Sequence, residues 1–318
     1  MQVSLALTVL NEGAHVRRLF DSIVKQTRPP DEVVVCDGGS SDDTLTVIAE
    51  YSNQLPLRTL NRSGANISTG RNAAISAARG EIIAVTDSGV RLAPDWLQKL
   101  VAAFDHEEIV LAAGFFSVDA HSTFQIAMGA TVLPTLEDVD STQFLPSSRS
   151  VAFRKSAWEA VGGYPEWLHY SEDVVFDITM RERFGDFAFV PGALAHFQPR
   201  GSLPAFAQQY FHYAAGDGHA GLFAGLHFIR YFTYLVAVPL GFYAALNVHP
   251  AIWALGALAG LAYVRRPLLR ANEMWGPLSM AQRGVVMLLL PIIRVVGDLS
   301  KMVGYPAGLW KRVTHGQK

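Results

Sequence analysis

Carboxylates follow three apolar, β-branched runs of this sequence. The three acids are Glu12, Asp37 and Asp87. In an open parallel sheet, ligands bind beyond the carboxyl ends of the strands. A nucleotide would offer these acids a base N–H, ribose hydroxyls and a metal-bound diphosphate, and Gly38 would let the backbone approach it. Each acid taken singly is better explained as a turn or cap residue. Only the three together predict a nucleotide site.

The elements that position these acids are predicted from short apolar runs that alternate with amphipathic stretches up to about residue 221. Four runs predict strands because they are β-branched and apolar on both faces, namely 3–10, 32–36, 81–86 and 110–116. Four stretches predict helices, namely 15–26, 42–51, 69–78 and 95–104. The alternation is typical of βα units. It predicts an α/β fold with a mainly parallel nucleotide-binding sheet flanked by helices.

The composition limits the class of protein. Of 318 residues, 50% are hydrophobic and 17% are charged, which is more apolar than a soluble domain of this size needs. The formal net charge is −2 and no long basic run occurs, so we expect no nucleic-acid partner. Cys36 is the only cysteine, which excludes an intrachain disulfide and a cysteine-based zinc site and fits a reducing compartment. Because no basic segment or cleavage site typical of a signal peptide opens the chain, we expect the N-terminal domain to stay in the cytosol.

Contact with lipid is predicted beyond Arg230. Two nearly uncharged runs, 231–246 and 251–264, lie between Arg230 and three later arginines. Positive charge at both ends favours a helical hairpin at 231–264 across the membrane. Each run is shorter than the ~20 residues of a full span, so a segment that dips in and returns is the alternative. A further apolar helix at 284–305 is expected to lie in the interface or to span. These features predict a protein of the cytoplasmic membrane with its catalytic domain facing the cytoplasm.

Six segments occur in an order and spacing typical of one enzyme family. They are LNE at 10–12, VCDGGSSDDT at 35–44, GRNAA at 70–74, AVTDSG at 84–89, GGYP at 162–165 and SED at 171–173. Together they resemble the family 2 glycosyltransferases of the GT-A fold over residues 3–218. The resemblance implies a GT-A domain at 1–225, and the apolar runs beyond it predict membrane helices at 226–318. It also implies transfer of a sugar from a nucleotide-diphosphate sugar, in cell envelope polysaccharide or glycolipid biosynthesis.

The resemblance implies a donor site at the strand ends. Glu12 and Asp37 would contact the nucleoside, and Asp87 would stand at the ribose and diphosphate as part of the family's metal-binding Asp-x-Asp. The donor-binding residues would be Asn11, Glu12, Asp37, Gly38, Arg71, Asp87 and Ser88. Charge that develops on the diphosphate needs a counter-charge, which a metal, Arg71 or Arg200 could supply.

The expected metal site departs from the family pattern. Gly89 stands where the family usually has a second aspartate, so a metal would lose one ligand. Such folds often recruit a late histidine, and His196, after a predicted strand at 186–190, matches that place. Asp87 and His196 would then hold Mg²⁺ or Mn²⁺, and Mn²⁺ tolerates the nitrogen ligand better. A half-buried structural histidine explains His196 equally well.

Two adjacent acids, Glu172 and Asp173, open a predicted helix at 173–184, where the helix dipole favours negative charge. By the resemblance they are the catalytic candidates, with Asp173 as the general base of an inverting transfer. A carboxylate must take the proton of the acceptor hydroxyl as that hydroxyl attacks the anomeric carbon. The residues assigned to the acceptor side are Gly163, Tyr164 and Arg200. Two acids in a first helical turn are also ordinary structure.

Residues 208–213 (QQYFHY) lie where processive relatives carry Gln-x-x-Arg-Trp, and the replacement of Arg-Trp predicts a non-processive enzyme. The acceptor is expected to be lipid-linked or another saccharide near the membrane, with membrane lipids as partners. Specificity is assigned to the weakly patterned region 121–150, whose acidic segment 135–141 is either a closing loop or a solvated connection.

Two other functions remain open from the sequence. A nucleotidyltransferase that makes sugar nucleotides should carry a phosphate loop rich in glycine and lysine, and residues 11–15 (NEGAH) are not one. A catalytically silent membrane scaffold of the same fold is favoured only by Gly89.

Overall fold

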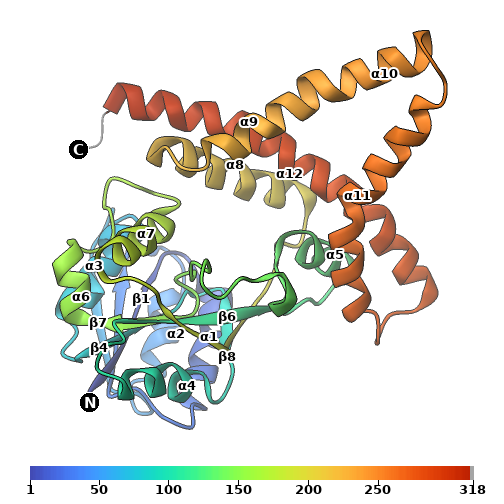
Figure 1. Ribbon diagram of the computed structural model, residues 1–318. Helices are drawn as coiled ribbons and strands as arrows, with labels where there is room; N and C mark the ends of the chain where they lie inside the picture. Colours follow the sequence, from blue (N-terminus) through green and yellow to red (C-terminus); the bar gives the residue numbers. More distant parts are fainter. Residues whose placement is uncertain (316–318) are drawn as a thin grey trace. The chain divides into compact units, whose positions relative to one another are not determined.

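The computed structural model describes residues 1–315, and the chain divides into two compact units (Figure 1). The sheet unit comprises Met1–Asp119 and Leu136–Gln198, and the helical unit comprises Ala120–Thr135 and Pro199–Lys318. The sequence placed the boundary near residue 225. In the structure, the chain leaves the sheet unit at Gln198, and an internal segment also joins the helical unit.

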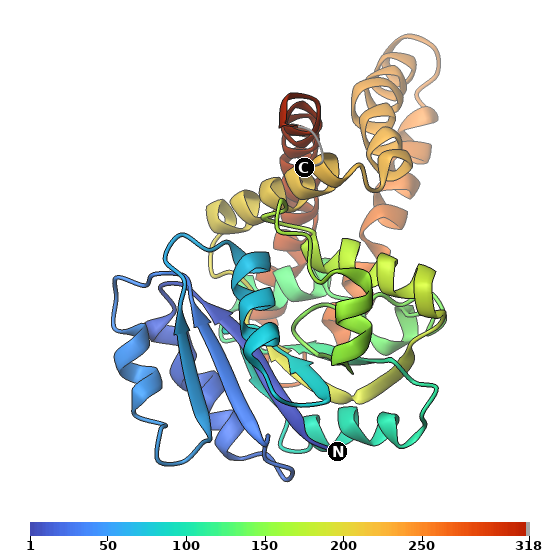
Figure 2. The ribbon, with the colours of Figure 1, turned by 90° about the vertical axis from the view of Figure 1, so that its left-hand side faces the viewer.

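One mixed sheet of eight strands organises the sheet unit, in the order β3-β2-β1-β4-β7-β6-β8-β5. Strands β3, β2, β1 and β4 are mutually parallel, β7 is antiparallel to both of its neighbours, β6 and β8 are parallel, and β5 is antiparallel to β8. The strands are β1 (Val3–Val9), β2 (Glu32–Asp37), β3 (Leu57–Asn61), β4 (Ile82–Val85), β5 (Val90–Leu92), β6 (Leu111–Val118), β7 (Val151–Arg154) and β8 (Ala188–Phe197). The parallel half, blue and cyan in Figure 2, is the predicted nucleotide-binding sheet.

Helices cover both faces of this sheet, as the doubly apolar strands predict. Side chains of β1 alternate between the two layers, so that Leu5 and Leu7 pack with one face and Ala6 with the other. The first face is covered by α1 (Gly13–Val24), α2 (Thr44–Ala49) and α4 (Trp96–Ala102). The second is covered by α3 (Ile67–Ala77), α6 (Lys155–Val161) and α7 (Glu172–Phe184). The α/β class predicted from the sequence is confirmed.

The helical unit contains α5 (Thr123–Val132), α8 (Leu203–Ala220), α9 (Ala224–Phe232), α10 (Val238–Asn247), α11 (Ile252–Glu273) and α12 (Met280–His315). Helices α9 and α10 are joined by a π-helical turn at Thr233–Ala237, and together they form one continuous helix, Ala224–Asn247. In the part of the chain that the structure describes, this is the one helix long and apolar enough to cross a membrane. Only 6% of its most apolar window is buried inside the protein.

The second run of the predicted hairpin forms the start of α11, but α11 does not meet the same test of length and apolarity. Support for a two-helix crossing is therefore weaker than the sequence indicated. The expected helix at 284–305 exists as part of the longer α12. Its charged residues do not simply face water, because Asp298 accepts hydrogen bonds from Arg230 Nε at 2.8 Å and from the Tyr263 hydroxyl at 2.6 Å.

Region 121–150, expected to be irregular, contains α5, which packs with α11 and α12 in the helical unit. Phe206 and Leu290 belong to the same apolar cluster as Met128. The acidic segment that follows α5 contains a short 3-10 turn at Leu136–Asp138 and belongs to the sheet unit from Leu136 onward. The region is therefore divided between two units, which its weak pattern did not reveal.

Candidate active site

Three neighbouring strands deliver polar residues to one edge of the sheet. Strands β2, β1 and β4 are adjacent and parallel. Asp37 ends β2, Asn11 and Glu12 follow β1, and Asp87 and Ser88 follow β4. The register pairs Val9 with Asp37, so both strands end at the same level. The structure thus brings together the acids that the strand-end argument singled out.

Asp37 and Asn11 shape the loop between β2 and α2. Asp37 is fully buried, and its Oδ2 accepts from the backbone N–H of Gly39 at 2.9 Å and of Ser40 at 3.0 Å. Asn11 Oδ1 accepts from the backbone N–H of Ser41 at 2.9 Å, and Asn11 itself is left-handed, with φ 54°. A non-glycine residue in this conformation carries strain that its surroundings must offset. The loop is therefore preorganised before any ligand arrives.

Two other predicted donor residues have less defined surroundings. Glu12 donates its backbone N–H to Thr44 Oγ1 at 2.8 Å, and its carboxylate lies 3.5 Å from His15 Nδ1. Gly38 is close to its neighbours, because an added Cβ would lie 3.3 Å from the carbonyl oxygen of Ala65. Ser88 is buried beside Asp87. Their contact with a donor stays a prediction.

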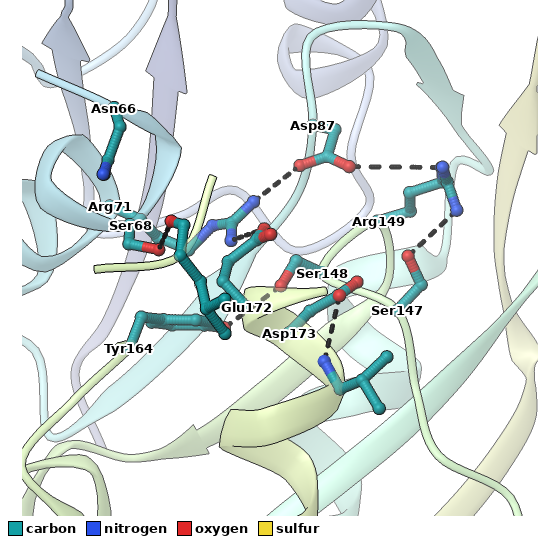
Figure 3. Close-up of polar contacts among 12 residues, drawn as sticks. Asn66, Ser68, Arg71, Asp87, Ser147, Ser148, Arg149, Tyr164, Glu172 and Asp173 are labelled. Carbon is teal, nitrogen blue, oxygen red and sulfur yellow. Dashed lines mark hydrogen bonds and ion pairs between the residues drawn. The ribbon is translucent and has the colours of Figure 1, made fainter. Parts of the chain in front are cut away.

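Arg71 of α3 connects the strand ends to the start of α7. Its side chain is 1% exposed, with Nη2 3.0 Å from Asp87 Oδ1 and Nη1 2.9 Å from Glu172 Oε1 (Figure 3). The guanidinium also lies 4.8 Å from the centre of the Tyr164 ring. A buried charge is tolerated when it is paired and hydrogen-bonded, and Arg71 contacts the carboxyl groups of both Asp87 and Glu172. Arg71 positions these two acids from the protein interior and does not face an open surface.

The start of α7 presents two acids with different surroundings. Glu172 is 5% exposed, and burial together with neighbouring Asp173 raises the pKa of Glu172 to about 7, against the opposing effect of Arg71. Asp173 is half-buried and accepts from the backbone N–H of Val174 at 2.9 Å. Ser171, just before the helix, has φ 61°. Of the two acids, Asp173 is the one that remains accessible to an incoming group.

Tyr164 and Gly163, expected on the acceptor side, take supporting positions instead. Tyr164 is 2% exposed, its ring stacks on Phe176 with centroids 4.2 Å apart, and its hydroxyl lies 3.2 Å from Ser148 Oγ. Gly163 has φ 77°, and a Cβ there would lie 2.8 Å from Asn72 Oδ1. Only glycine fits such a position without strain. Contact of either residue with an acceptor stays a prediction.

Arg149, which precedes β7, is the site residue that the sequence argument missed. Its Nε lies 4.0 Å from Asp87 Oδ2, and its Nη1 donates to Ser147 Oγ at 3.0 Å. Figure 3 shows Asp87 between the guanidiniums of Arg71 and Arg149. The available signal was a single arginine among serines, at 147–150, directly before a short apolar run.

The expected metal ligands do not come together. His196 lies on β8, pairs in the sheet with Arg91 of β5, and its Nδ1 is 2.7 Å from Ser117 Oγ. Burial and the cations Arg91 and Arg18 lower the pKa of His196. Over residues 1–315 no group of three or more His, Cys, Asp or Glu side chains could hold a metal ion. Asp87 alone, next to two guanidiniums, does not make a complete divalent-cation site.

Arg200, expected on the acceptor side, is exposed and belongs to the helical unit.

The chain has a GT-A-like α/β fold, the fold of known glycosyltransferases. The chain resembles solved structures of such enzymes, including a mannosyltransferase from Pyrobaculum calidifontis in complex with GDP-Man and Mn²⁺ (TM-score 0.55, 17% identity, 95% of this chain and 87% of that one). It also resembles S. aureus TarS 1-349 in complex with UDP-GlcNAc (TM-score 0.52, 16% identity, 99% and 92%). At this identity the likeness shows the fold.

The family follows from the sequence itself. Residues 4–159 match the model of Glycosyl transferase family 2, so the chain carries a family 2 glycosyltransferase domain. A curated relative, the chondroitin synthase of Pasteurella multocida, is 34% identical over 181 residues, which are 57% of this chain and 19% of that protein. The chain thus spans only about a fifth of that relative. The resemblance inferred from the motifs is confirmed at the level of family and fold.

Proposed function

We propose that this protein is an inverting glycosyltransferase that moves a sugar from a nucleotide-diphosphate sugar to an acceptor hydroxyl. The observation that carries the proposal is the connection through Arg71. This buried cation joins Asp87, at the strand ends where a nucleotide binds, to Glu172, next to the accessible Asp173. One buried cation of the sheet unit would therefore hold the proposed donor edge and the start of α7, which carries the proposed base, in a fixed relation.

The donor nucleotide is proposed to bind over the ends of β2, β1 and β4. Asp37 and Asn11 fix the backbone of the loop that would receive the nucleoside, and Gly39 (φ 100°) is exposed within that loop. Asp87, 30% exposed at its side chain, would lie at the ribose and diphosphate. Nucleotides enter open α/β sheets at this edge because the strand ends and helix starts present polar backbone groups there.

Asp173 is proposed to act as the general base. As the acceptor oxygen forms its bond to the anomeric carbon, its proton passes to the Asp173 carboxylate, and the bond to the diphosphate breaks on the opposite face. The backbone N–H of Val174 holds one carboxylate oxygen, which leaves the other for the acceptor. Glu172, buried against Arg71, would orient this helix start and does not itself touch the acceptor.

A divalent cation at this edge, Mg²⁺ or Mn²⁺, would have Asp87 as its carboxylate ligand and would take its other ligands from the donor and water. Because the residues around Asp87 do not complete such a site, no step of the proposed reaction is assigned to a metal.

The acceptor is proposed to be lipid-linked or otherwise close to a membrane. The helix Ala224–Asn247 is apolar, barely buried and long enough to cross a bilayer, and it could anchor the enzyme in the cytoplasmic membrane with the sheet unit on the cytoplasmic side. Anchoring raises the effective concentration of a substrate in the same membrane. The change at 212–213 supports a single transfer and not the threading of a polymer.

The decisive experiment incubates membranes that carry the protein with radiolabelled sugar nucleotides and separates lipid-soluble from water-soluble products. Label that moves into the lipid fraction supports both the transfer and the acceptor class, and transfer only into water-soluble saccharide removes the lipid-linked acceptor. A silent scaffold would move no label, and a nucleotidyltransferase would form nucleotide sugar and pyrophosphate from sugar phosphate and nucleoside triphosphate.

A further inference from the structure

The geometry around Asp87 points to Arg149 as the residue that binds the donor diphosphate, in place of the divalent cation that a second aspartate would help to hold. This inference rests on the proposed function, because it assumes that a nucleotide diphosphate occupies the edge formed by β2, β1 and β4. We propose that the donor binds, and that transfer proceeds, without a divalent metal.

Arg149 is placed to meet an anion. Its Nε lies 4.0 Å from the Asp87 carboxylate, so its charge is directed at the residue expected beside the diphosphate. The guanidinium is held on its other sides, because Nη1 donates to Ser147 Oγ at 3.0 Å and the plane lies 4.5 Å from the centre of the Phe197 ring. A preoriented guanidinium matches phosphate oxygens and loses little entropy on binding them.

Exposure distinguishes Arg149 from Arg71. The Arg71 side chain is 1% exposed and is already engaged by Asp87 and Glu172, whereas the Arg149 side chain is 19% exposed. Arg71 is enclosed, and Arg149 is the more exposed of the two guanidiniums that flank Asp87. A diphosphate that arrives over Asp87 would therefore meet Arg149 without first breaking the buried pairs.

The same arrangement disfavours a divalent cation. Arg71 lies 3.0 Å and Arg149 lies 4.0 Å from the carboxylate oxygens of Asp87. A metal bound to Asp87 would therefore lie close to both guanidiniums, and the like charges would repel one another. Gly89 supplies no side-chain ligand. Ser117 Oγ holds His196 Nδ1 on β8, and Arg18 and Arg91 lie near enough to lower the pKa of that histidine. A site that needs two or more oxygen ligands from the protein does not fit this set.

Arg149 could instead serve only to stabilise the sheet unit, since it also packs on Phe197. The two roles differ in their consequences. A structural role predicts a lower melting temperature with unchanged affinity for nucleotide, whereas a binding role predicts lost affinity in a protein that melts normally.

The test measures the affinity of the full-length protein for UDP, GDP, ADP, CDP and dTDP by calorimetry, in EDTA and again with Mn²⁺. We expect at least one of these nucleotides to bind in EDTA with an affinity that Mn²⁺ changes less than about threefold. Arg149→Gln should weaken that binding about tenfold or more, as the loss of a charge-assisted hydrogen bond predicts. Arg149→Lys keeps the charge and loses the planar fork, so its affinity should lie between those of the unmodified protein and Arg149→Gln. Arg183→Ala, a change at an exposed arginine on α7, is the matched control.

A gain-of-function variant provides an independent readout. No atom lies within 4 Å of a Cβ added at Gly89, and its φ is not left-handed, so Gly89→Asp should fold normally. Combined with Arg149→Gln it restores a pair of carboxylates and removes one repelling cation. We expect this double variant to bind Mn²⁺ measurably in electron paramagnetic resonance titrations while the unmodified protein does not.

Binding that requires Mn²⁺ in the unmodified protein, or affinity unaffected by Arg149→Gln, would overturn the inference. Mn²⁺ bound by the unmodified protein without nucleotide would overturn it as well. If none of the five nucleotides binds under either condition, the proposed function itself is wrong, so the two failures can be told apart.

Discussion

At the scale of single residues, the site depends on how one buried cation is shared among acids. Arg71 is almost fully enclosed, and it is stable there because Asp87 and Glu172 both contact it at hydrogen-bond distance. Removing one partner of such a buried pair costs roughly 3–5 kcal/mol, because the other charge remains buried without compensation. Conservative changes at the acids therefore distinguish catalytic effects from structural ones better than changes at Arg71 do.

Asp173→Asn tests the proposed base. The amide is nearly the same size and can still accept from the Val174 N–H, but it cannot take a proton from the acceptor. We expect the rate of transfer to fall by about 10²–10⁴, the usual contribution of general base catalysis, while affinity for the donor changes little.

The measurement compares turnover and nucleotide affinity in the same preparation, with Asp186→Asn as a control acid of the sheet unit that lies outside the site. Turnover of Asp173→Asn within a few fold of the unmodified protein would remove this residue from the proposed mechanism.

Glu172→Gln tests the raised pKa of the neighbouring acid. Burial and Asp173 raise the pKa of Glu172 to about 7 from its ordinary 4.5, so the folded protein keeps a proton that the unfolded chain has lost. Between those two pH values, rising pH therefore favours the unfolded chain, and the stabilising effect is complete only below about pH 4.5.

We expect the unmodified protein to lose thermal stability from pH 5 to pH 8 relative to Glu172→Gln, which has no proton to release. Glu182→Gln, an exposed acid on the same helix, is the matched control and should follow the unmodified protein. Parallel melting curves for all three proteins would contradict the raised pKa.

At the scale of helices and strands, the sequence predicted the elements that a short-range hydrophobic pattern encodes. Strands β1, β2 and β4 are continuous apolar runs, and their ends carry the expected acids. Strand β5 has only three residues, too short for any periodicity to be visible. Arg149 was missed because its position depends on the pairing of β7 with β4, a contact between residues far apart in sequence.

Residues whose burial depends on tertiary contacts were also beyond the sequence. Tyr164 belongs to a family motif, yet only the packing of Phe176 and Arg71 against its ring shows that it lies under the site. His196 has the spacing of a possible ligand, but Ser117 on the neighbouring strand β6 holds its ring nitrogen. The sequence placed His196 after a strand at 186–190, whereas the structure has it inside β8, and spacing along the chain could not predict what surrounds either side chain.

The packing of α12 on α8 provides a test at the same scale. A Cβ added at Gly304 would lie 2.2 Å from the carbonyl oxygen of Phe211, so the two backbones approach as closely as glycine allows. Gly284, on the same helix, has no neighbour within 4 Å of such a Cβ.

Gly304→Ala should therefore destabilise the helical unit by about 1–3 kcal/mol through overpacking. Gly284→Ala should be neutral or slightly stabilising, because alanine favours the helix. Thermal unfolding of both variants in the same detergent checks the difference, and equal melting temperatures would show that the two helices do not pack this closely.

At the scale of the whole molecule, the proposed function combines a family 2 catalytic domain with apolar helices. The segment Ala224–Asn247 carries exposed side chains that water would not favour, among them Leu235 at 64% and Leu240 at 60% exposure. Contiguous exposed apolar surface of this kind marks contact with lipid or protein. The length of the helix favours lipid.

Leu235→Arg combined with Leu240→Arg tests the anchor. An arginine near the centre of a spanning helix costs about 2.5–3.5 kcal/mol on the scale of membrane insertion, so two should prevent this segment from crossing. We expect the variant to leave the membrane fraction in carbonate or to be degraded in cells, whereas Phe184→Arg, at an exposed apolar residue of the sheet unit, should remain membrane-bound. Nucleotide binding by the soluble fraction shows whether the sheet unit stays folded. Retention of the double variant in carbonate-washed membranes would mean that Ala224–Asn247 is not the anchor. The anchor would then be sought in α11 or α12.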